Sequence, residues 1–293
     1  MILFKWSVIF LLFLNTSLGI SQTLIKSEQK SLWEYGIGFG YIHYEQYPAA
    51  DQFSDLFLPF PTFQYRGEIL RADDREGTRA YIFKSANWSL ELSGGGNTPL
   101  SASDNKAREG MQDIPLMIHI GPQIVGHLLE NLELRLGFFQ AISTDFKYTK
   151  VNGGIQETQL VYRVLSDHSA GRINSRFSLS AKSASKDYLE TYFEVSPQYA
   201  TGKRAEYKAN AGFLGFELNY FRSISFGKAS YYVGAAINDY SLSSNRKSPL
   251  HKSNYNLSYL LGMTYTLGQS KRESVPVDET EGIINKQQKK YQY

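Results

Sequence analysis

The chain has 293 residues, with 31 Lys and Arg against 28 Asp and Glu, which gives a formal net charge of +3 at pH 7. This small charge is spread along the chain and gives no support for nucleic-acid binding. The sequence has no cysteine, which excludes a disulfide framework, a thiolate metal site and a cysteine nucleophile.

The first residues have the pattern of a secretory signal peptide. Lys5 supplies a basic start, an apolar stretch runs from Trp6 to Leu14, and small or polar residues follow as far as Ser21. The apolar core is shorter than the roughly 20 residues that a membrane-spanning helix needs. We therefore expect a cleaved signal peptide at residues 1–21 rather than a membrane anchor.

Beyond this segment, charged or polar residues interrupt every apolar run, and the dominant period is two. The clearest case is residues 254–267, where Tyr, Leu and Met at odd positions alternate with even positions that are mainly Asn, Ser, Thr and Gly. Such alternation predicts an all-β chain with few or no helices. We expect strands at residues 33–44, 57–70, 79–92, 112–129, 131–148, 157–166, 172–183, 188–196, 208–222, 228–242 and 254–267.

Two architectures use this alternation: a soluble β-sandwich and an antiparallel transmembrane β-barrel. The polar faces carry both signs of charge, which can pair inside a narrow lumen, and the signal peptide and strand lengths also favour the barrel. Because bacterial single-chain barrels have even strand numbers, we expect about 12 strands, or about 10 if two short strands do not span. The predicted barrel covers residues 22–268, and residues 269–293 form a polar, flexible tail. The candidate lumen-facing residues are Glu91, Glu133, Arg135, Arg176, Lys182 and Glu217.

Other features have simpler explanations than a catalytic or metal site. The five histidines lie on separate predicted strands and loops without metal-ligand spacing, so we expect no metal and no cofactor. Asp167, His168 and Ser169 are expected in a hairpin turn rather than in a hydrolase relay.

Gly36, Gly38 and Gly40 alternate along a strand, and we interpret them as small inward residues that leave space in the lumen. The charged segment 104–113 is expected to be a solvated loop, or else a docking or gating loop. Tyrosines at predicted strand ends are expected at the membrane interfaces: Tyr44, Tyr148, Tyr188, Tyr220 and Tyr240.

Several segments, in a compatible order across nearly the whole mature chain, resemble the MipA/OmpV family of outer-membrane proteins. They are Tyr35–Tyr41, Leu58–Pro61, Asp104–Ile114, Ile120–Pro122, Tyr192–Gln198, Tyr207–Gly212 and Ser248–Pro249–Leu250. The resemblance implies a non-enzymatic barrel in contact with outer-membrane lipid. It also implies a scaffold that holds a lytic murein transglycosylase near a bifunctional penicillin-binding protein.

Other members of that family are described as porin-like, so a passive channel for small solutes or ions is the alternative function. An outer-membrane hydrolase is the third hypothesis, and only the serine and histidine of the segment 167–169 could support it.

Overall fold

The computed structural model describes residues 30–73, 77–85, 87–144, 149–168 and 171–274. The predicted signal peptide, residues 22–29 of the predicted barrel and residues 275–293 of the predicted tail lie outside these ranges. The side chains of Asp167 and His168 and the whole of Ser169 are also outside the description, so the proposed relay has no structural account.

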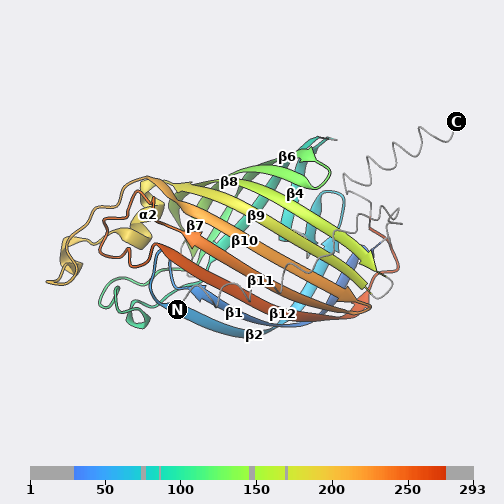
Figure 1. Ribbon diagram of the computed structural model, residues 1–293, viewed down its shortest axis with the longest axis horizontal. Helices are drawn as coiled ribbons and strands as arrows, with labels where there is room; N and C mark the ends of the chain where they lie inside the picture. Colours follow the sequence, from blue (N-terminus) through green and yellow to red (C-terminus); the bar gives the residue numbers. More distant parts are fainter. Residues whose placement is uncertain (1–29, 74–76, 86, 145–148, 169–170, 275–293) are drawn as a thin grey trace, which may run out of the picture.

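In the described part of the chain, antiparallel strands pair in sequence order, and the last strand pairs with the first to close a barrel (Figure 1). The predicted transmembrane-type barrel of 12 strands is thus confirmed. The strands are β1 (Trp33–Glu45), β2 (Phe53–Arg66), β3 (Leu70–Asp73), β4 (Gly77–Lys84), β5 (Trp88–Asn97), β6 (Met117–Leu129), β7 (Leu132–Thr144), β8 (Thr149–His168), β9 (Gly171–Ala184), β10 (Gly212–Phe226), β11 (Ala229–Asp239) and β12 (Tyr255–Gln269).

The alternating pattern determines which side chains face outward. On β12, Leu257, Leu261 and Leu267 are 41%, 54% and 51% exposed, whereas Asn256, next to Leu257, is 3% exposed. Large apolar side chains are exposed in the same way on nearly every strand of the barrel. An outer surface of this composition suits lipid rather than water. Apolar side chains are favourable in contact with hydrocarbon, whereas polar groups placed there raise the free energy of the folded protein.

The glycines of β1 do face inward, but they do not leave the lumen empty. Gly38 pairs with Phe60 of β2, and a Cβ atom at Gly38 would lie 2.6 Å from the Phe60 ring. A Cβ atom at Gly36 would lie 2.9 Å from the Thr62 hydroxyl and even closer to the backbone of β12. The glycines therefore make room for side chains of the neighbouring strand, which the sequence interpretation missed.

The predicted strand at residues 188–196 is wrong, because the helix α2 (Lys186–Phe193) occupies most of it. Tyr188, Leu189, Tyr192 and Phe193 are all buried, and their spacing places them on one face of a helix. Two short 3₁₀ helices, η1 (Ala102–Asp104) and η2 (Pro197–Tyr199), also lie in loops. None of the helices in the described ranges is long and apolar enough to cross a membrane.

Two other predicted strands each extend over parts of two strands of the structure. The range 57–70 covers most of β2 and the first residue of β3, and the range 79–92 covers β4 and half of β5. The second error arose because few residues separate the end of β4 at Lys84 from the start of β5 at Trp88, and the apolar residues on either side continue the period of two.

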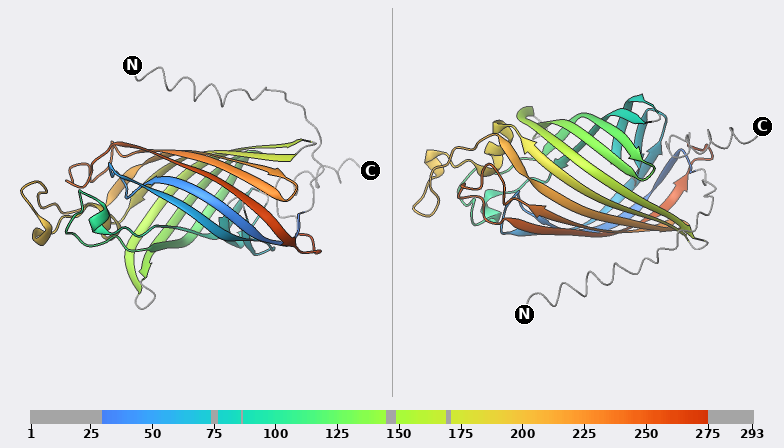
Figure 2. Two further views of the ribbon diagram at one scale, coloured as in Figure 1. Left: turned by 90° about the horizontal axis from the view of Figure 1, so that it is seen from below. Right: turned by 45° about the horizontal axis from the view of Figure 1, so that its top comes forward.

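The two ends of the barrel differ in their connections. One end carries long loops at residues 46–52, 98–116, 185–211 and 240–254, together with α2 (Figures 1 and 2). The other end carries short turns, such as 67–69, 130–131 and 227–228, and the first and last strands begin and end there. In outer-membrane barrels the short turns face the periplasm and the longer loops face outward.

A charge placed on the outer surface tests whether lipid surrounds the barrel. Leu261→Arg, near the middle of β12, should lower the free energy of unfolding by about 2–4 kcal/mol, the cost of an arginine at the bilayer midplane. The measurement is urea unfolding in lipid vesicles, followed by tryptophan fluorescence. Leu242→Arg is the control, because Leu242 is 67% exposed in a loop and should tolerate the charge. Equal effects of the two substitutions would contradict a lipid-facing surface.

Candidate functional site: the capped chamber of the barrel

The long loops at one end pack into a core of their own, which we call the cap. Its members come from all four long loops and from the strand ends next to them. Fully buried side chains include Leu189 and Phe193 of α2, Ile114, Val195 and Leu250. Burial of each large apolar side chain contributes about 1.5–3 kcal/mol. The main apolar core of this protein therefore lies in the cap and not in the barrel interior.

Hydrogen bonds and a cation–π contact hold the cap loops to one another. Arg108 donates to the carbonyl oxygens of Tyr192 (3.3 Å) and Gln112 (3.2 Å), and its guanidinium lies 5.6 Å from the centre of the Tyr47 ring. The Tyr47 hydroxyl donates to the Leu250 carbonyl at 2.9 Å. Part of the charged segment 104–113 is thus structural, since Asn105 and Arg108 are 0% and 3% exposed.

Burial in the cap also sets the protonation of its phenols. It raises the pKa of Tyr47 and Tyr192 above the usual range for tyrosine. The same desolvation lowers the pKa of Arg108. The phenols therefore remain neutral hydrogen-bonding groups inside the cap.

A cavity of about 550 Å³, which we call the chamber, lies beneath the cap. Tyr188 and Tyr192 of α2 face it from the cap side, and the inner faces of several strands line the rest. Its charged lining residues are Glu45, Arg135, Glu157, Arg176, Lys182 and Glu217. Three carboxylates and three cations therefore surround one space.

The charges of the chamber are partly paired. The Lys182 ammonium lies 2.9 Å from Oε2 of Glu217 and 3.9 Å from Oε1 of Glu157. Glu45 accepts hydrogen bonds from the amides of Asn238 and Asn256 and from the Tyr240 hydroxyl. The Arg176 guanidinium lies 5.5 Å from the centre of the Phe221 ring.

A second charge cluster is centred on Glu133. One oxygen of Glu133, Oε2, accepts from Nη2 of Arg135 at 2.6 Å and from Nη2 of Arg163 at 3.2 Å. The other oxygen lies 3.9 Å from Nδ1 of His127. All these side chains lie on inward positions of β6, β7 and β8, so they join neighbouring strands across the inner wall.

The structure places all six candidate lumen residues on the inner face of the barrel. Arg135, Arg176, Lys182 and Glu217 line the chamber, whereas Glu91 and Glu133 are buried, at 3% and 7% exposure. Their part in function stays a prediction. Sequence reasoning missed Glu45 and Glu157, although Glu157 lies on a predicted strand and alternates with outward residues.

The tyrosines predicted at the membrane interfaces mostly lie elsewhere. Tyr188 and Tyr240 are buried, at 6% and 7% exposure, and Tyr44 lines the chamber. Tyr220 does face outward, where its ring lies 4.7 Å from that of Phe177. Tyr148 lies outside the described residues.

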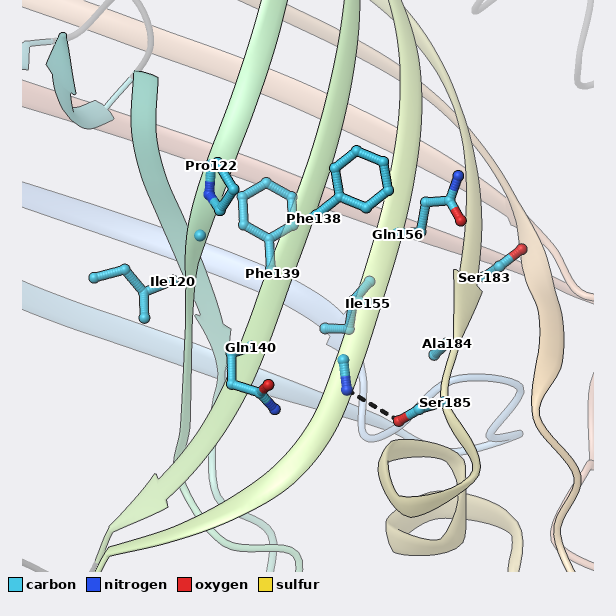
Figure 3. Close-up of a pocket in the computed structure, with 12 residues that line it drawn as sticks. Ile120, Pro122, Phe138, Phe139, Gln140, Ile155, Gln156, Ser183, Ala184 and Ser185 are labelled. Atoms are coloured by element: carbon cyan, nitrogen blue, oxygen red, sulfur yellow. Dashed lines mark hydrogen bonds between the residues drawn. The ribbon is translucent and has the colours of Figure 1, made fainter. Parts of the chain in front are cut away.

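A second hollow, of about 440 Å³, lies in the wall formed by β6 to β9 (Figure 3). Here Pro122 interrupts the β6–β7 ladder between the pairs Ile120–Gln140 and Gln123–Gly137, because proline has no N–H to donate. The Gly154 N–H donates to the Ser185 hydroxyl at 2.9 Å, which ties β8 to the start of α2. Outward-facing Ile120 and Phe138 line this hollow, so it belongs to the lipid-facing surface.

Within the described ranges, no group of three or more His, Asp or Glu side chains is placed to hold a metal ion. A closed antiparallel barrel with an apolar outer surface and charge pairs inside defines a protein of the outer-membrane β-barrel class. The family model described as "MltA-interacting protein MipA" matches residues 36–267. The chain belongs to the MipA family, as the resemblance in the sequence predicted.

No curated protein matches the chain. Among solved structures, a bacterial polysaccharide outer membrane secretin aligns with a TM-score of 0.37 and 9% identity, over 82% of this chain and 100% of that one. LpxR from Salmonella typhimurium aligns with a TM-score of 0.30 and 8% identity, over 64% and 86%. OccK8 (OprE) from Pseudomonas aeruginosa aligns with a TM-score of 0.24 and 8% identity, over 71% of this chain and 68% of that one. Similarities this low carry no inference about function.

The Glu133 cluster generates a stability prediction. Glu133→Gln keeps the shape of the side chain but leaves two buried guanidinium groups without their carboxylate. Loss of one partner from a buried pair costs about 3–5 kcal/mol, so the free energy of unfolding in lipid vesicles should fall by that amount. Glu130→Gln, at an exposed turn position, is the matched control. A loss below about 1 kcal/mol would show that the cluster is not a structural tie.

Proposed function

We propose that this protein is a non-enzymatic scaffold of the outer membrane that holds a lytic murein transglycosylase near a murein-synthesising penicillin-binding protein. We also propose that a cleaved signal peptide at residues 1–21 directs its export. The family description supports the first partner, because it names an interaction with MltA. The second partner rests on the resemblance alone.

The observation that carries the scaffold proposal is how the two ends of the barrel differ. At the capped end, the large apolar side chains are mostly packed against one another. At the short-turn end, by contrast, Ile69 and Leu129 are 67% and 64% exposed. Murein enzymes work in the periplasm, where the short turns of such barrels lie. Exposed apolar side chains on a rigid rim suit a protein partner.

The scaffold proposal predicts that the turn end binds the transglycosylase. Ile69→Asp should weaken capture of purified transglycosylase by the detergent-solubilised barrel about tenfold, which corresponds to about 1.4 kcal/mol. The measurement is the Kd by surface-immobilised binding at fixed salt.

Leu242→Asp is a matched control, because Leu242 is also 67% exposed but lies in a cap loop at the opposite end. It should leave the Kd unchanged. Binding that is lost in the control and retained in Ile69→Asp would place the partner at the capped end. Wild-type protein that binds no transglycosylase would overturn the proposal.

The chamber favours a second candidate function, a passive channel, because its mixed charges and volume resemble a polar lumen. The cap argues against it, since Leu189 and Phe193 are fully buried on α2, the helix whose Tyr188 and Tyr192 line the chamber. We therefore expect purified wild-type protein to give no conductance steps in planar bilayers.

Leu189→Ala should loosen the cap by about 2–5 kcal/mol and produce intermittent steps. Steady conductance of the wild type, with an ion selectivity that changes in Arg135→Gln, would favour the channel.

A further inference from the structure

The barrel wall is incomplete between β2 and β5. β2 pairs with β3 only at Tyr65 and Arg66, and in the residues the structure covers, no strand pairs with 53–64 on that side. On the other side of this gap, β5 pairs with β4 only from Ser89 to Ser93, so residues 94–97 pair with β6 alone. The intervening β3 and β4 have four and eight residues, fewer than the about 9–11 that a spanning strand needs.

This opening in the hydrogen-bonded wall, which we call the window, has a frame on every side. Residues 53–64 of β2 and residues 94–97 of β5 form its sides. Towards the short-turn end it is bounded by β3 and β4, described as far as Asp73 and from Gly77. Towards the cap, the loop 98–116 meets the loop 46–52, where the Asn105 amide donates to Oε1 of Gln46 at 2.6 Å. The window is therefore a defined feature of the wall and not a frayed edge.

The edge of β2 is built against the addition of another strand. Pro59 and Pro61 pair with β1 without a change of register. A proline fits such a ladder only where its nitrogen points away from the partner strand, so both nitrogens face the window. Neither nitrogen can donate a hydrogen bond to an incoming strand, and proline on an edge is a common protection against pairing. A ligand for this opening need not supply a backbone ladder.

On the β2 side of the window, part of the inner wall is apolar, which is unusual for a barrel lumen, whereas Arg71, Arg79 and Glu91 are buried on β3, β4 and β5. The registers place Ile42, Leu56, Leu58, Phe60 and Leu260 on the inner face of β1, β2 and β12. Ile42 and Leu58 are 40% and 48% exposed although they face inward. We call these five residues the apolar strip. The Glu133 cluster and most charged residues of the chamber lie on β6 to β10, whereas Glu45 lies at the end of β1.

The chamber borders both the window and the end of the strand that carries Ile42. Its lining includes Tyr44 and Glu45 at the end of β1, and also residues 94–97 at the free edge of β5. Gly94, Gly95 and Gly96 on that edge are exposed. None of the five strip residues lines the chamber, but Ile42 lies two positions before Tyr44, which does, so a long molecule along the strip would reach the chamber.

We propose that the lumen binds a single-chain zwitterionic amphiphile that enters from the bilayer through the window. Its acyl chain lies along the apolar strip, and its head group lies in the chamber. A head with both charges fits the chamber, because Glu45, Glu157 and Glu217 face Arg135, Arg176 and Lys182 there. This inference is independent of the scaffold proposal and concerns a different surface.

The absence of cysteine from the sequence permits a site-specific test in lipid nanodiscs. Leu58→Cys places a bimane label on the apolar strip, and Phe57→Cys places it one residue away on the lipid-facing side, where Phe57 is 68% exposed. The probe is lysophosphatidylcholine with bromine atoms on its acyl chain, which quench bimane on contact. Quenching at Leu58→Cys should saturate and should be reversed by unbrominated lysophosphatidylcholine. Quenching at Phe57→Cys should rise linearly with the probe and should not be reversed.

A second set of variants tests the strip itself. In the Leu58→Cys background, Leu56→Glu should weaken the apparent affinity about tenfold or more, because the acyl chain loses an apolar contact. Leu165→Glu is the control, since Leu165 is an inward, 45% exposed leucine on β8, away from the strip. Heat-modifiable migration in gels confirms that each variant is folded.

Linear, irreversible quenching at both labels would overturn the proposal. So would equal effects of Leu56→Glu and Leu165→Glu in folded protein. Spontaneous disulfide-linked dimers of unlabelled Phe57→Cys would also overturn it, because they would place a second copy of the chain at the β2 edge.

Discussion

Outside the window, the structure depends on the requirement that backbone N–H and C=O groups inside a bilayer be paired within the protein. A strand cannot satisfy its own backbone, so the sheet closes when β12 pairs with β1. Closure in turn separates an outer surface, which lipid solvates, from an interior in which charges must find partners. The alternating sequence, the inward carboxylates and the pairing of Glu133 with two arginines are consequences of this single requirement.

The same requirement explains why the apolar core lies outside the barrel proper. A soluble sandwich would bury its leucines between two sheets, but here most strand leucines face lipid. Long loops have no lipid to cover them, so their apolar residues pack against one another. The cap results, and Tyr47, Ile114, Leu189 and Leu250 from four different loops or loop edges meet in it. The chamber is the space between this core and the charged inner wall.

Much of the barrel could be predicted because a period of two is a local property. Residues 254–267 show it with Leu260 as the exception, and β12 lies there with the expected residues facing outward. The inward position of Arg135, Arg176 and Lys182 follows from the same parity. The window could not be predicted, because it depends on which strands pair and for how long. Likewise, the space beside Gly38 is filled by Phe60 from another strand, and only the register between strands reveals this.

The helix α2 shows a different limit. Tyr188, Leu189, Tyr192 and Phe193 are compatible with a short strand when only their apolar character is considered, and the helical spacing covers just two turns. The cap selects the helix, since it buries all four side chains on one face. Glu45 was missed for a related reason: it lies at the last position of β1, where its inward position depends on the contacts with Asn238 and Asn256.

The pairing of the first and last strands also has a consequence for assembly. Trp33 and Ser270 meet at the seam, although 237 positions separate them in the sequence. Contacts this distant form slowly, because the entropy lost in closing so long a loop must be recovered by the seam itself. The chain therefore has to remain unfolded and shielded until its final strand is available. β1 begins and β12 ends side by side, so a short linker could join the two strands. The chain could then be opened at a distant turn. Such a circularly permuted protein would complete its barrel by a different last step.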